Sequence, residues 1–176
     1  MPRSLIGFAL GLLLVAWPAS VTAQVDAEPE FDRVVSINPL ALVILGLVSA
    51  DYEQTLGQNT TGGVSAEYFD WRDRGYLSVD GKVRYYVSGR ALEGLAIGTV
   101  LGFTRIGEDS EGEDARSRRS GTAIGVGFSA EHQWLLGEDE RLALTTGLGG
   151  KRLFFLRDVA AQRALPMLRF SIGWAF

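Results

Sequence analysis

The sequence predicts an all-β protein, an eight-stranded antiparallel up-and-down transmembrane β-barrel. Apolar and polar residues alternate with period two, the pattern of a half-buried strand, in eight segments of 10 to 17 residues. A soluble strand usually has about 5–6 residues, whereas a tilted strand that crosses a membrane needs about 9–11. Short polar turns alternate with longer loops, as a membrane barrel requires. The segments are residues 33–42, 46–56, 61–71, 75–87, 94–106, 120–136, 141–155 and 164–176.

Residues 1–23 have the three parts of a signal peptide. Arg3 supplies the positive charge, residues 5–17 form an uninterrupted apolar run, and the segment ending at Ala23 offers small residues for cleavage. The apolar run is shorter than the roughly 20 residues of a membrane-spanning helix. We therefore expect export, a short periplasmic tail at residues 24–32 and a barrel at residues 33–176.

The composition argues against several classes of site. Without cysteine the chain has no disulfides, thiolate metal ligands or acylated N-terminal Cys anchor, and its single histidine excludes a multi-His metal centre. The formal net charge of −4 argues against nucleic-acid binding, which usually requires a basic surface. We accordingly expect no metal, no cofactor and no nucleic-acid partner.

One face of the predicted strands is continuously apolar. Residues 168–176 illustrate this, because their odd positions are Arg169, Ser171, Gly173 and Ala175 while their even positions are large and apolar. The same division holds in segments 46–56, 75–87 and 120–136. Their apolar members are Val48, Ala50, Tyr52, Leu56, Leu77, Val79, Val83, Tyr85, Val87, Ile124, Val126, Phe128, Ala130 and Trp134.

The opposite face combines very small residues with charges of both signs. A soluble barrel has a polar outside and an apolar inside, whereas a membrane barrel reverses the two. The narrow bore of an eight-stranded barrel also explains why 22 of 176 residues are glycine, well above the usual ~7%. We predict an interior charge network that fills the bore, with Glu53, Arg84 and Glu131 at similar depth. Its members are Asp51, Glu53, Glu67, Asp80, Lys82, Arg84, Glu131, Lys151 and Arg169.

The connections predict the orientation of the barrel. Turns 57–60, 88–93 and 137–140 are short, whereas connections 107–119 and 156–163 are longer. An even number of strands puts both termini on the short-turn, periplasmic side. Residues 107–119 hold five acids followed by three arginines, which could bind divalent cations and lipopolysaccharide phosphates or form a solvated loop.

Two further features are aromatic and apolar. Aromatic side chains near the strand ends predict girdles at the two membrane interfaces, with Trp71, Tyr76, Phe103 and Phe154 toward the loops and Trp134, Trp174 and Phe176 toward the turns. Residues 39–48 are apolar throughout and make the first predicted hairpin apolar on both faces. This hairpin could lie in the outer leaflet, cover the barrel mouth, or contact a hydrophobic ligand or partner.

The C-terminus carries the most specific motif. The chain ends in Phe and has an apolar residue at every second position before it: Leu168, Phe170, Ile172, Trp174 and Phe176. This ending resembles the assembly signal of bacterial outer-membrane β-barrels, and the chain from about residue 32 resembles small eight-stranded barrels of the OmpA/OmpX type. Residues 37–40 and 91–94 are also similar to uncharacterised bacterial families known only as outer-membrane β-barrels.

The resemblance implies a location and partners rather than a reaction. It implies the outer membrane of a Gram-negative bacterium, contact with its lipid and lipopolysaccharide, and insertion by the barrel-assembly machinery. We also expect a monomer. Lipid A deacylases resemble this chain in size and export, but they carry a His two residues before a Ser, whereas Trp134 follows His132 at that spacing.

We therefore expect no catalytic residues and an envelope structural or interaction role. The alternatives are a lipid A-modifying hydrolase and a narrow conduit for small hydrophobic solutes, which could leave through a gap in the wall.

Overall fold

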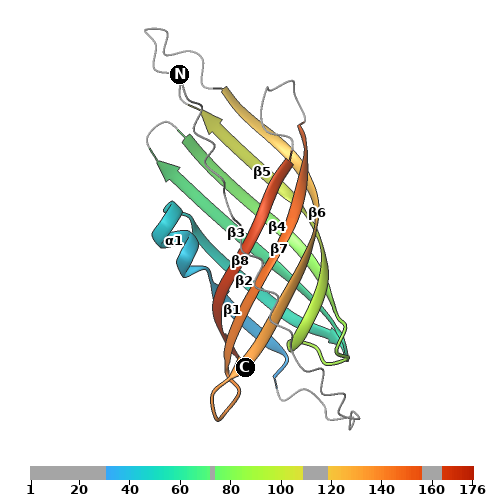
Figure 1. Ribbon diagram of the computed structural model, residues 1–176. Coiled ribbons are helices and arrows are strands. Elements are labelled where there is room, and N and C mark those ends of the chain that lie inside the picture. The colour runs from blue at the N-terminus through green and yellow to red at the C-terminus, as the bar shows by residue number, and fades with distance from the viewer. Residues whose placement is uncertain (1–30, 72–73, 109–118, 156–163) are drawn as a thin grey trace, which may run out of the picture.

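The computed structural model describes residues 31–71, 74–108, 119–155 and 164–176, and these residues form a closed antiparallel barrel (Figure 1). Each strand pairs with the next along the chain, and the last pairs with the first. The predicted fold class is therefore confirmed. The elements are β1 (Arg33–Ile37), α1 (Pro39–Leu45), β2 (Val48–Gly57), β3 (Thr60–Trp71), β4 (Arg74–Tyr86), β5 (Gly94–Glu108), β6 (Arg119–Leu136), β7 (Leu142–Phe155) and β8 (Ala164–Ala175).

The strands after β1 begin and end within two residues of their predicted bounds, but the first predicted strand is wrong in its second half. β1 ends at Ile37, and the chain then forms α1. The Asn38 side chain accepts a hydrogen bond from the Ala41 backbone N–H at 2.9 Å, and Pro39, which has no N–H, starts the first turn. Gly46 ends the helix with a φ of 67°, which glycine adopts without strain.

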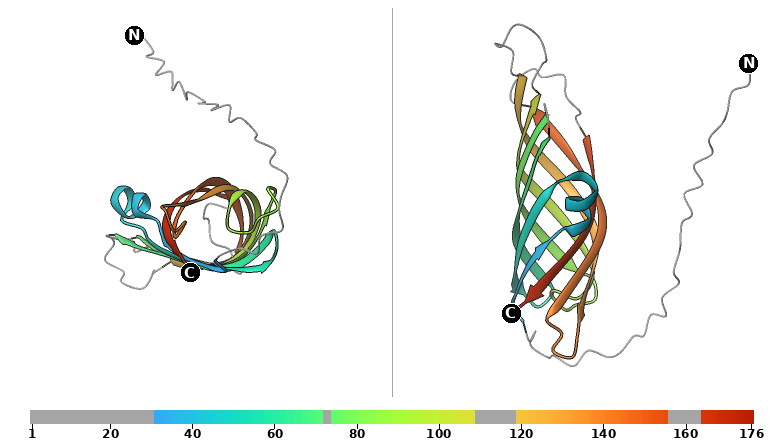
Figure 2. Two further views of the ribbon diagram at one scale, coloured as in Figure 1. Left: turned by 90° about the horizontal axis from the view of Figure 1, so that it is seen from below. Right: turned by 90° about the vertical axis from the view of Figure 1, so that its left-hand side faces the viewer.

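The α1 helix corrects the expectation of an apolar hairpin at residues 39–48. Seen along the barrel axis, it lies outside the ring of strands, and it contacts β8 and β2 (Figure 2). Its side chains from Leu42 to Leu45 are exposed on the outer surface. None of the helices in the described ranges is long and apolar enough to cross a membrane.

The two ends of the barrel differ in their connections. The β2–β3, β4–β5 and β6–β7 turns lie at the same end as Phe176 and residue 31, which we call the turn end (Figure 1). The β3–β4, β5–β6 and β7–β8 strand pairs are connected at the other end, which we call the loop end. The two predicted loops 107–119 and 156–163 lie almost entirely outside the described residues, and their proposed roles stay predictions.

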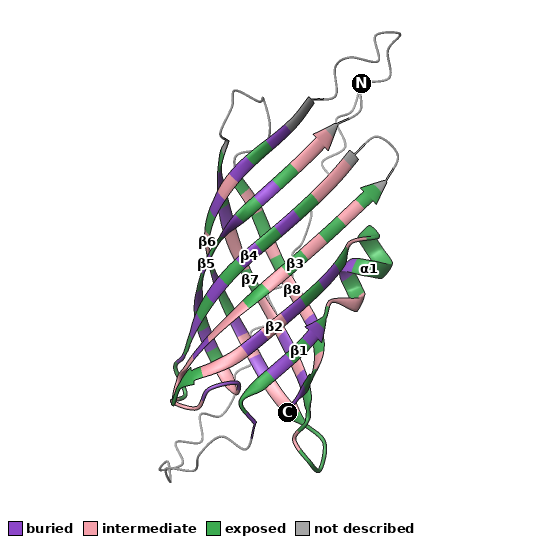
Figure 3. Cartoon of the chain, turned by 180° about the vertical axis from the view of Figure 1, so that it is seen from behind, coloured by how far each residue is buried: buried purple, intermediate pink, exposed green. Residues whose placement is uncertain are grey.

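Burial alternates along the strands (Figure 3), and the large apolar residues are among the exposed ones. Leu168 is 84% exposed and Phe128 is 67% exposed, whereas Arg84 and Glu131 are buried. The outer wall is thus apolar and the bore is polar. This is the arrangement of a barrel whose wall faces lipid.

The short β1 leaves a gap in the wall. β1 pairs with β8 only from Ile172 to Ala175, whereas β7 pairs with β8 from Ala164 onward. Among the described strands, residues 164–171 of β8 therefore have a neighbour on one edge only. On the other side of the gap, Val48 and Ser49 of β2 pair with β3 but not with β1. We call this opening, between β8 and the α1–β2 segment, the lateral gap.

The turn end is packed with apolar side chains. Phe31, Val34, Leu92, Ala143 and Ala175 form one buried cluster. The β4–β5 turn contributes Leu92, which is 1% exposed, and a hydrogen bond from the Ala91 N–H to the Gln58 carbonyl at 2.7 Å holds this turn against the β2–β3 turn. The bore is therefore filled at the turn end.

Candidate functional site

The buried guanidinium of Arg84 is the centre of the turn-end part of the bore. Its Nη1 lies 2.9 Å from Glu53 Oε2, and its Nε lies 3.3 Å from Glu131 Oε2. β4, β2 and β6 supply these three side chains, each from an inward-facing position. The structure thus brings together the three residues that the sequence suggested to lie at one depth.

Neutral side chains complete this cluster and were not singled out as site residues from the sequence. The Tyr86 hydroxyl donates to Glu53 Oε1 at 3.0 Å, and Thr61 donates to the same oxygen. Gln133 accepts from Arg84 Nη1 at 3.3 Å and donates to the Leu92 carbonyl at 2.8 Å, which connects the cluster to the turn-end packing. Tyr86 lies two residues after Arg84 and four after Lys82 on β4, so all three face the same side of the sheet. Its inward position could therefore have been inferred from the sequence.

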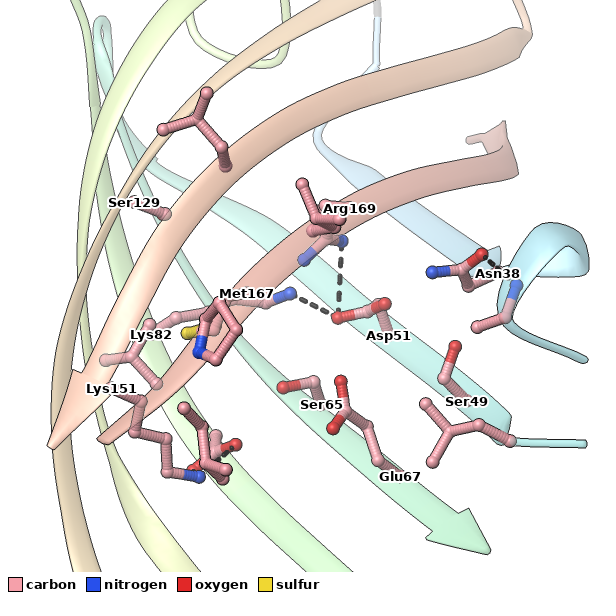
Figure 4. A pocket seen from close by; sticks show the side chains of 18 of the residues that line it. Asn38, Ser49, Asp51, Ser65, Glu67, Lys82, Ser129, Lys151, Met167 and Arg169 are labelled. Atoms are coloured by element: carbon pink, nitrogen blue, oxygen red, sulfur yellow. Dashed lines mark hydrogen bonds and ion pairs between the residues drawn. The ribbon is translucent and has the colours of Figure 1, made fainter. Parts of the chain in front are cut away.

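The network continues toward the loop end. Arg169 of β8 lies 3.5 Å from Glu131 and 3.2 Å from Asp51, and Asp51 also accepts a hydrogen bond from Lys82 (Figure 4). Six of the nine predicted charged residues are therefore connected by ion pairs. Pairing of this kind offsets the cost of burying charges, because an isolated buried ion costs several kcal/mol.

A second ion pair lies on the loop-end side. Lys151 Nζ is 2.6 Å from Asp80 Oδ1 and donates to Ser78 Oγ at 2.8 Å. Ser78 Oγ in turn lies 3.0 Å from Thr104 Oγ1. This pair joins β7 to β4 across the bore.

Glu67 differs from the other eight predicted residues. Within the described ranges, its carboxylate has no ion-pair partner within 4.0 Å and accepts one hydrogen bond, from the Tyr76 hydroxyl at 3.3 Å. Tyr76 lines the bore cavity, where it contacts Glu67, so its assignment to the loop-end aromatic girdle is wrong. On the neighbouring strand Ser49 pairs with Glu67 in register, and the buried Ser49 Oγ has no hydrogen-bond partner in the same ranges.

The loop-end half of the bore contains a cavity of about 420 Å³. Inward-facing charged residues line it, including Asp51, Glu67, Lys82 and Lys151 (Figure 4). Between them are small residues, Ser49, Ser65 and Ser129, which leave the space open. The expectation of a filled interior therefore applies to the turn end and not to the loop end.

The cavity extends through the lateral gap to the outer surface. Its lining includes Leu165 and Met167, which are at inward-facing positions of β8. It also includes Pro166 and Leu168, which are exposed on the outer face. Ala41 and Leu45 of α1 and Leu47 line the opposite side. One continuous space thus connects buried charges with the apolar outer wall.

Glycines on the inner face make room for the charged side chains. A Cβ on Gly102 would overlap the Asp80 carboxylate and the β4 backbone, and a Cβ on Gly125 would overlap the alkyl chain of Lys151. A Cβ on Gly147 would lie 2.5 Å from Glu131 Cγ. The glycine excess in the sequence therefore accompanies the buried charges.

The remaining predicted residues have the following positions. Leu168, Ile172, Trp174 and Phe176 of the assembly motif are exposed on the outer face, and Phe170, at the same parity, is partly exposed. Near the turn end, the His132 ring is 4.3 Å from the Trp134 ring, centroid to centroid. Within the described ranges, no group of three or more His, Asp or Glu side chains is arranged to hold a metal ion.

Comparisons with known proteins agree with this architecture. A family model described as "Protein of unknown function (DUF3575)" matches residues 11–157. The crystal structure of the N-terminal β-barrel domain of Pseudomonas aeruginosa OprF is similar to this one, with a TM-score of 0.51 over 85% of this chain and 100% of that domain. The two are 13% identical, so the likeness concerns the fold. No curated protein sequence matches the chain.

Proposed function

The chain belongs to the DUF3575 family, and we propose that it is an integral protein of the Gram-negative outer membrane with a structural or interaction role. The observation that carries this proposal is the inversion of the two faces. Large apolar side chains cover the outer wall, while paired charges are buried in the bore. A soluble barrel would place the apolar side chains inside, so this distribution favours a lipid environment.

A closed bore supports a role other than ion conduction. Arg84 bridges Glu53 and Glu131 across the turn-end half, and Leu92 packs below them. An ion would have to displace buried, mutually paired charges to pass through. The barrel therefore serves the envelope as a membrane-anchored body rather than as a pore.

We also propose that the protein is not an enzyme. The described lining of the cavity contains serines and carboxylates but no histidine. His132 is at an outward-facing position of β6 and lies beside Trp134. General-base catalysis needs the base within hydrogen-bond reach of its nucleophile, and these positions do not provide that arrangement. Mass analysis of lipid A from cells with and without the protein is the direct test, and unchanged lipid A is the expected result.

Biogenesis and neighbours follow from the same proposal. Residues 1–23 act as a cleaved signal peptide, and the assembly machinery recognises the outward-facing motif from Leu168 to Phe176. The mature barrel is a monomer in contact with lipid and lipopolysaccharide. The exposed apolar side chains of Leu168, Ile172, Trp174 and Phe176 support the contact with lipid and the recognition of the motif, because all four are on the outer face.

Cell fractionation combined with gel mobility tests the proposed location. The protein should be recovered with the outer membrane, and its mobility should shift on boiling, because folded barrels resist detergent until they are heated. The purified barrel should give no conductance steps in planar bilayers. Recovery in the cytoplasm or stable conductance steps would overturn the proposal.

A further inference from the structure

We propose that the lateral gap is a binding site for one membrane amphiphile with an ammonium head group. Its apolar chain lies at the outer surface against Leu45 of α1 and Leu168 of β8, and its head group reaches Glu67 and Ser49 in the bore. This inference rests on the proposed function, because the gap opens onto lipid only if the barrel spans the membrane.

The open edge of β8 requires something polar beside it. Residues 164–171 pair with β7, and none of the strands that the structure describes pairs with them on the side of the gap. Backbone N–H and C=O groups in contact with hydrocarbon cost several kcal/mol each, so irregular or unpaired backbone in a membrane lines a water-filled or otherwise polar space. The polar cavity behind this edge meets that requirement, and it also provides a path from the lipid into the bore.

The lining of the cavity changes character along this path. At the outer surface, Leu45 of α1, Leu148 of β7 and Leu168 of β8 provide an apolar wall. Inside the bore, Asp51, Glu67 and Lys82 provide a charged one (Figure 4). A molecule that matches both ends has an apolar chain joined to a polar head group. Binding pockets for small molecules generally combine such an apolar lining with a few convergent polar groups.

The charges of the pocket indicate the chemistry of the head group. The lining holds four acidic side chains, Asp51, Glu67, Asp80 and Glu131, against three basic ones, Lys82, Lys151 and Arg169. Each of these cations pairs with Asp51, Asp80 or Glu131, which leaves the Glu67 carboxylate as the excess charge.

Beside Glu67, Ser49 is only 8% exposed, and its buried Oγ has no hydrogen-bond partner in the described ranges. The two side chains come from directly paired residues of β2 and β3, and both line the cavity (Figure 4). Glu67 and Ser49 can both accept hydrogen bonds, and an ammonium group supplies several donors and one positive charge. A carboxylate or phosphate head group would instead face an excess of negative charge.

The test uses the full barrel in lipid nanodiscs and three probes of equal chain length: a saturated fatty amine, fatty alcohol and fatty acid. The amine should bind saturably and in preference to the other two. Ethanolamine, which has the amine without the chain, should not bind. Because a charge-assisted hydrogen bond is lost, Glu67→Gln should weaken amine binding about tenfold or more. Glu138→Gln, in the exposed β6–β7 turn, removes the same charge elsewhere and should leave binding unchanged.

A second variant tests the path independently. Ala41 is buried and lines the gap, so Ala41→Phe should obstruct the gap and weaken amine binding without changing the charge. The heat-dependent mobility shift on the same samples reports whether each barrel is folded. A wild-type protein without the shift contradicts the proposed function itself. A folded wild type that binds the fatty acid or alcohol as tightly as the amine overturns this inference alone. So does amine binding that neither Glu67→Gln nor Ala41→Phe weakens.

Discussion

The turn-end and loop-end halves of the barrel share seven of their strands but fill the bore differently. In the turn-end half, β8 has β1 as a neighbour, and long side chains such as Arg84, Tyr86 and Gln133 occupy the interior. In the loop-end half, β1 is absent, the inward positions include small serines, and a cavity of about 420 Å³ opens through the wall. Charged side chains alone therefore do not fill the bore. Side-chain length and an unbroken wall decide whether it is filled.

The largest expected effect comes from removing the central cation of the turn-end half. Arg84→Met leaves Glu53 buried without its ion-pair partner and removes one of the two partners of Glu131, which should lower the free energy of unfolding by about 3–5 kcal/mol. Urea unfolding of the barrel in lipid vesicles measures this change. Arg90→Met is the matched control, because Arg90 is partly exposed and its ion pair with Glu93 should contribute only about 0–1 kcal/mol. Equal losses for the two variants would contradict the account of the network.

Packing at the turn end gives the next largest effect. Leu92→Ala removes a side chain that is 1% exposed and should cost about 2–3 kcal/mol. Leu165→Ala, beside the loop-end cavity, should cost about 1 kcal/mol or less, since Leu165 is already partly exposed. The same unfolding experiment compares the two. A reversed order would mean that the loop-end half is the better packed one.

The glycines of the inner face should show a smaller effect. Gly102→Ala places a methyl group against Asp80 and should cost about 1–3 kcal/mol. Gly150→Ala, where an added Cβ has nothing within 4 Å, should change stability by about 0.5 kcal/mol or less. Unfolding curves of both variants in one lipid would distinguish these outcomes, and an equal cost would remove the link between glycine and buried charge.

The smallest effect on stability is expected for Glu67, whose carboxylate has no ion-pair partner in the described ranges. Glu67→Gln should change stability by about 0.5 kcal/mol or less, since it removes no ion pair of that part of the chain. Glu53→Gln should instead cost about 1.5–3 kcal/mol, because Arg84 loses a charged acceptor. A large loss at Glu67 would indicate a structural role and would weaken the case for a ligand there.

The strands could be predicted because alternation over long segments specifies both the strand and its faces. Positions 168 to 176 define the outward and inward sides without any knowledge of the fold, and the glycine excess indicates a narrow bore. The error at residues 33–42 arose because an apolar run gives no period by itself. Asn38 and Pro39 cap the start of a helix and Gly46 caps its end. These local signals make residues 39–45 helical, although the apolar run alone is compatible with a strand.

The site was predictable only in part. Parity identifies which charged residues face the bore, but the pairing of Arg169 with both Asp51 and Glu131 depends on how the strands are staggered around the barrel. The cavity and the lateral gap follow from the early end of β1, which no pattern within the other strands reveals. The separation of Glu67 from the ion-pair chain likewise becomes visible only in three dimensions.

The inversion of the two faces is tested most directly at adjacent positions of β6. Because the chain has no cysteine, Phe128→Cys and Ser129→Cys each create a single site for a nitroxide label. Phe128 is 67% exposed on the outer wall, and Ser129 is 4% exposed in the bore. In lipid vesicles, dissolved oxygen should relax the label at 128 strongly and the label at 129 weakly. Strong relaxation at 129 with protection at 128 would contradict the account.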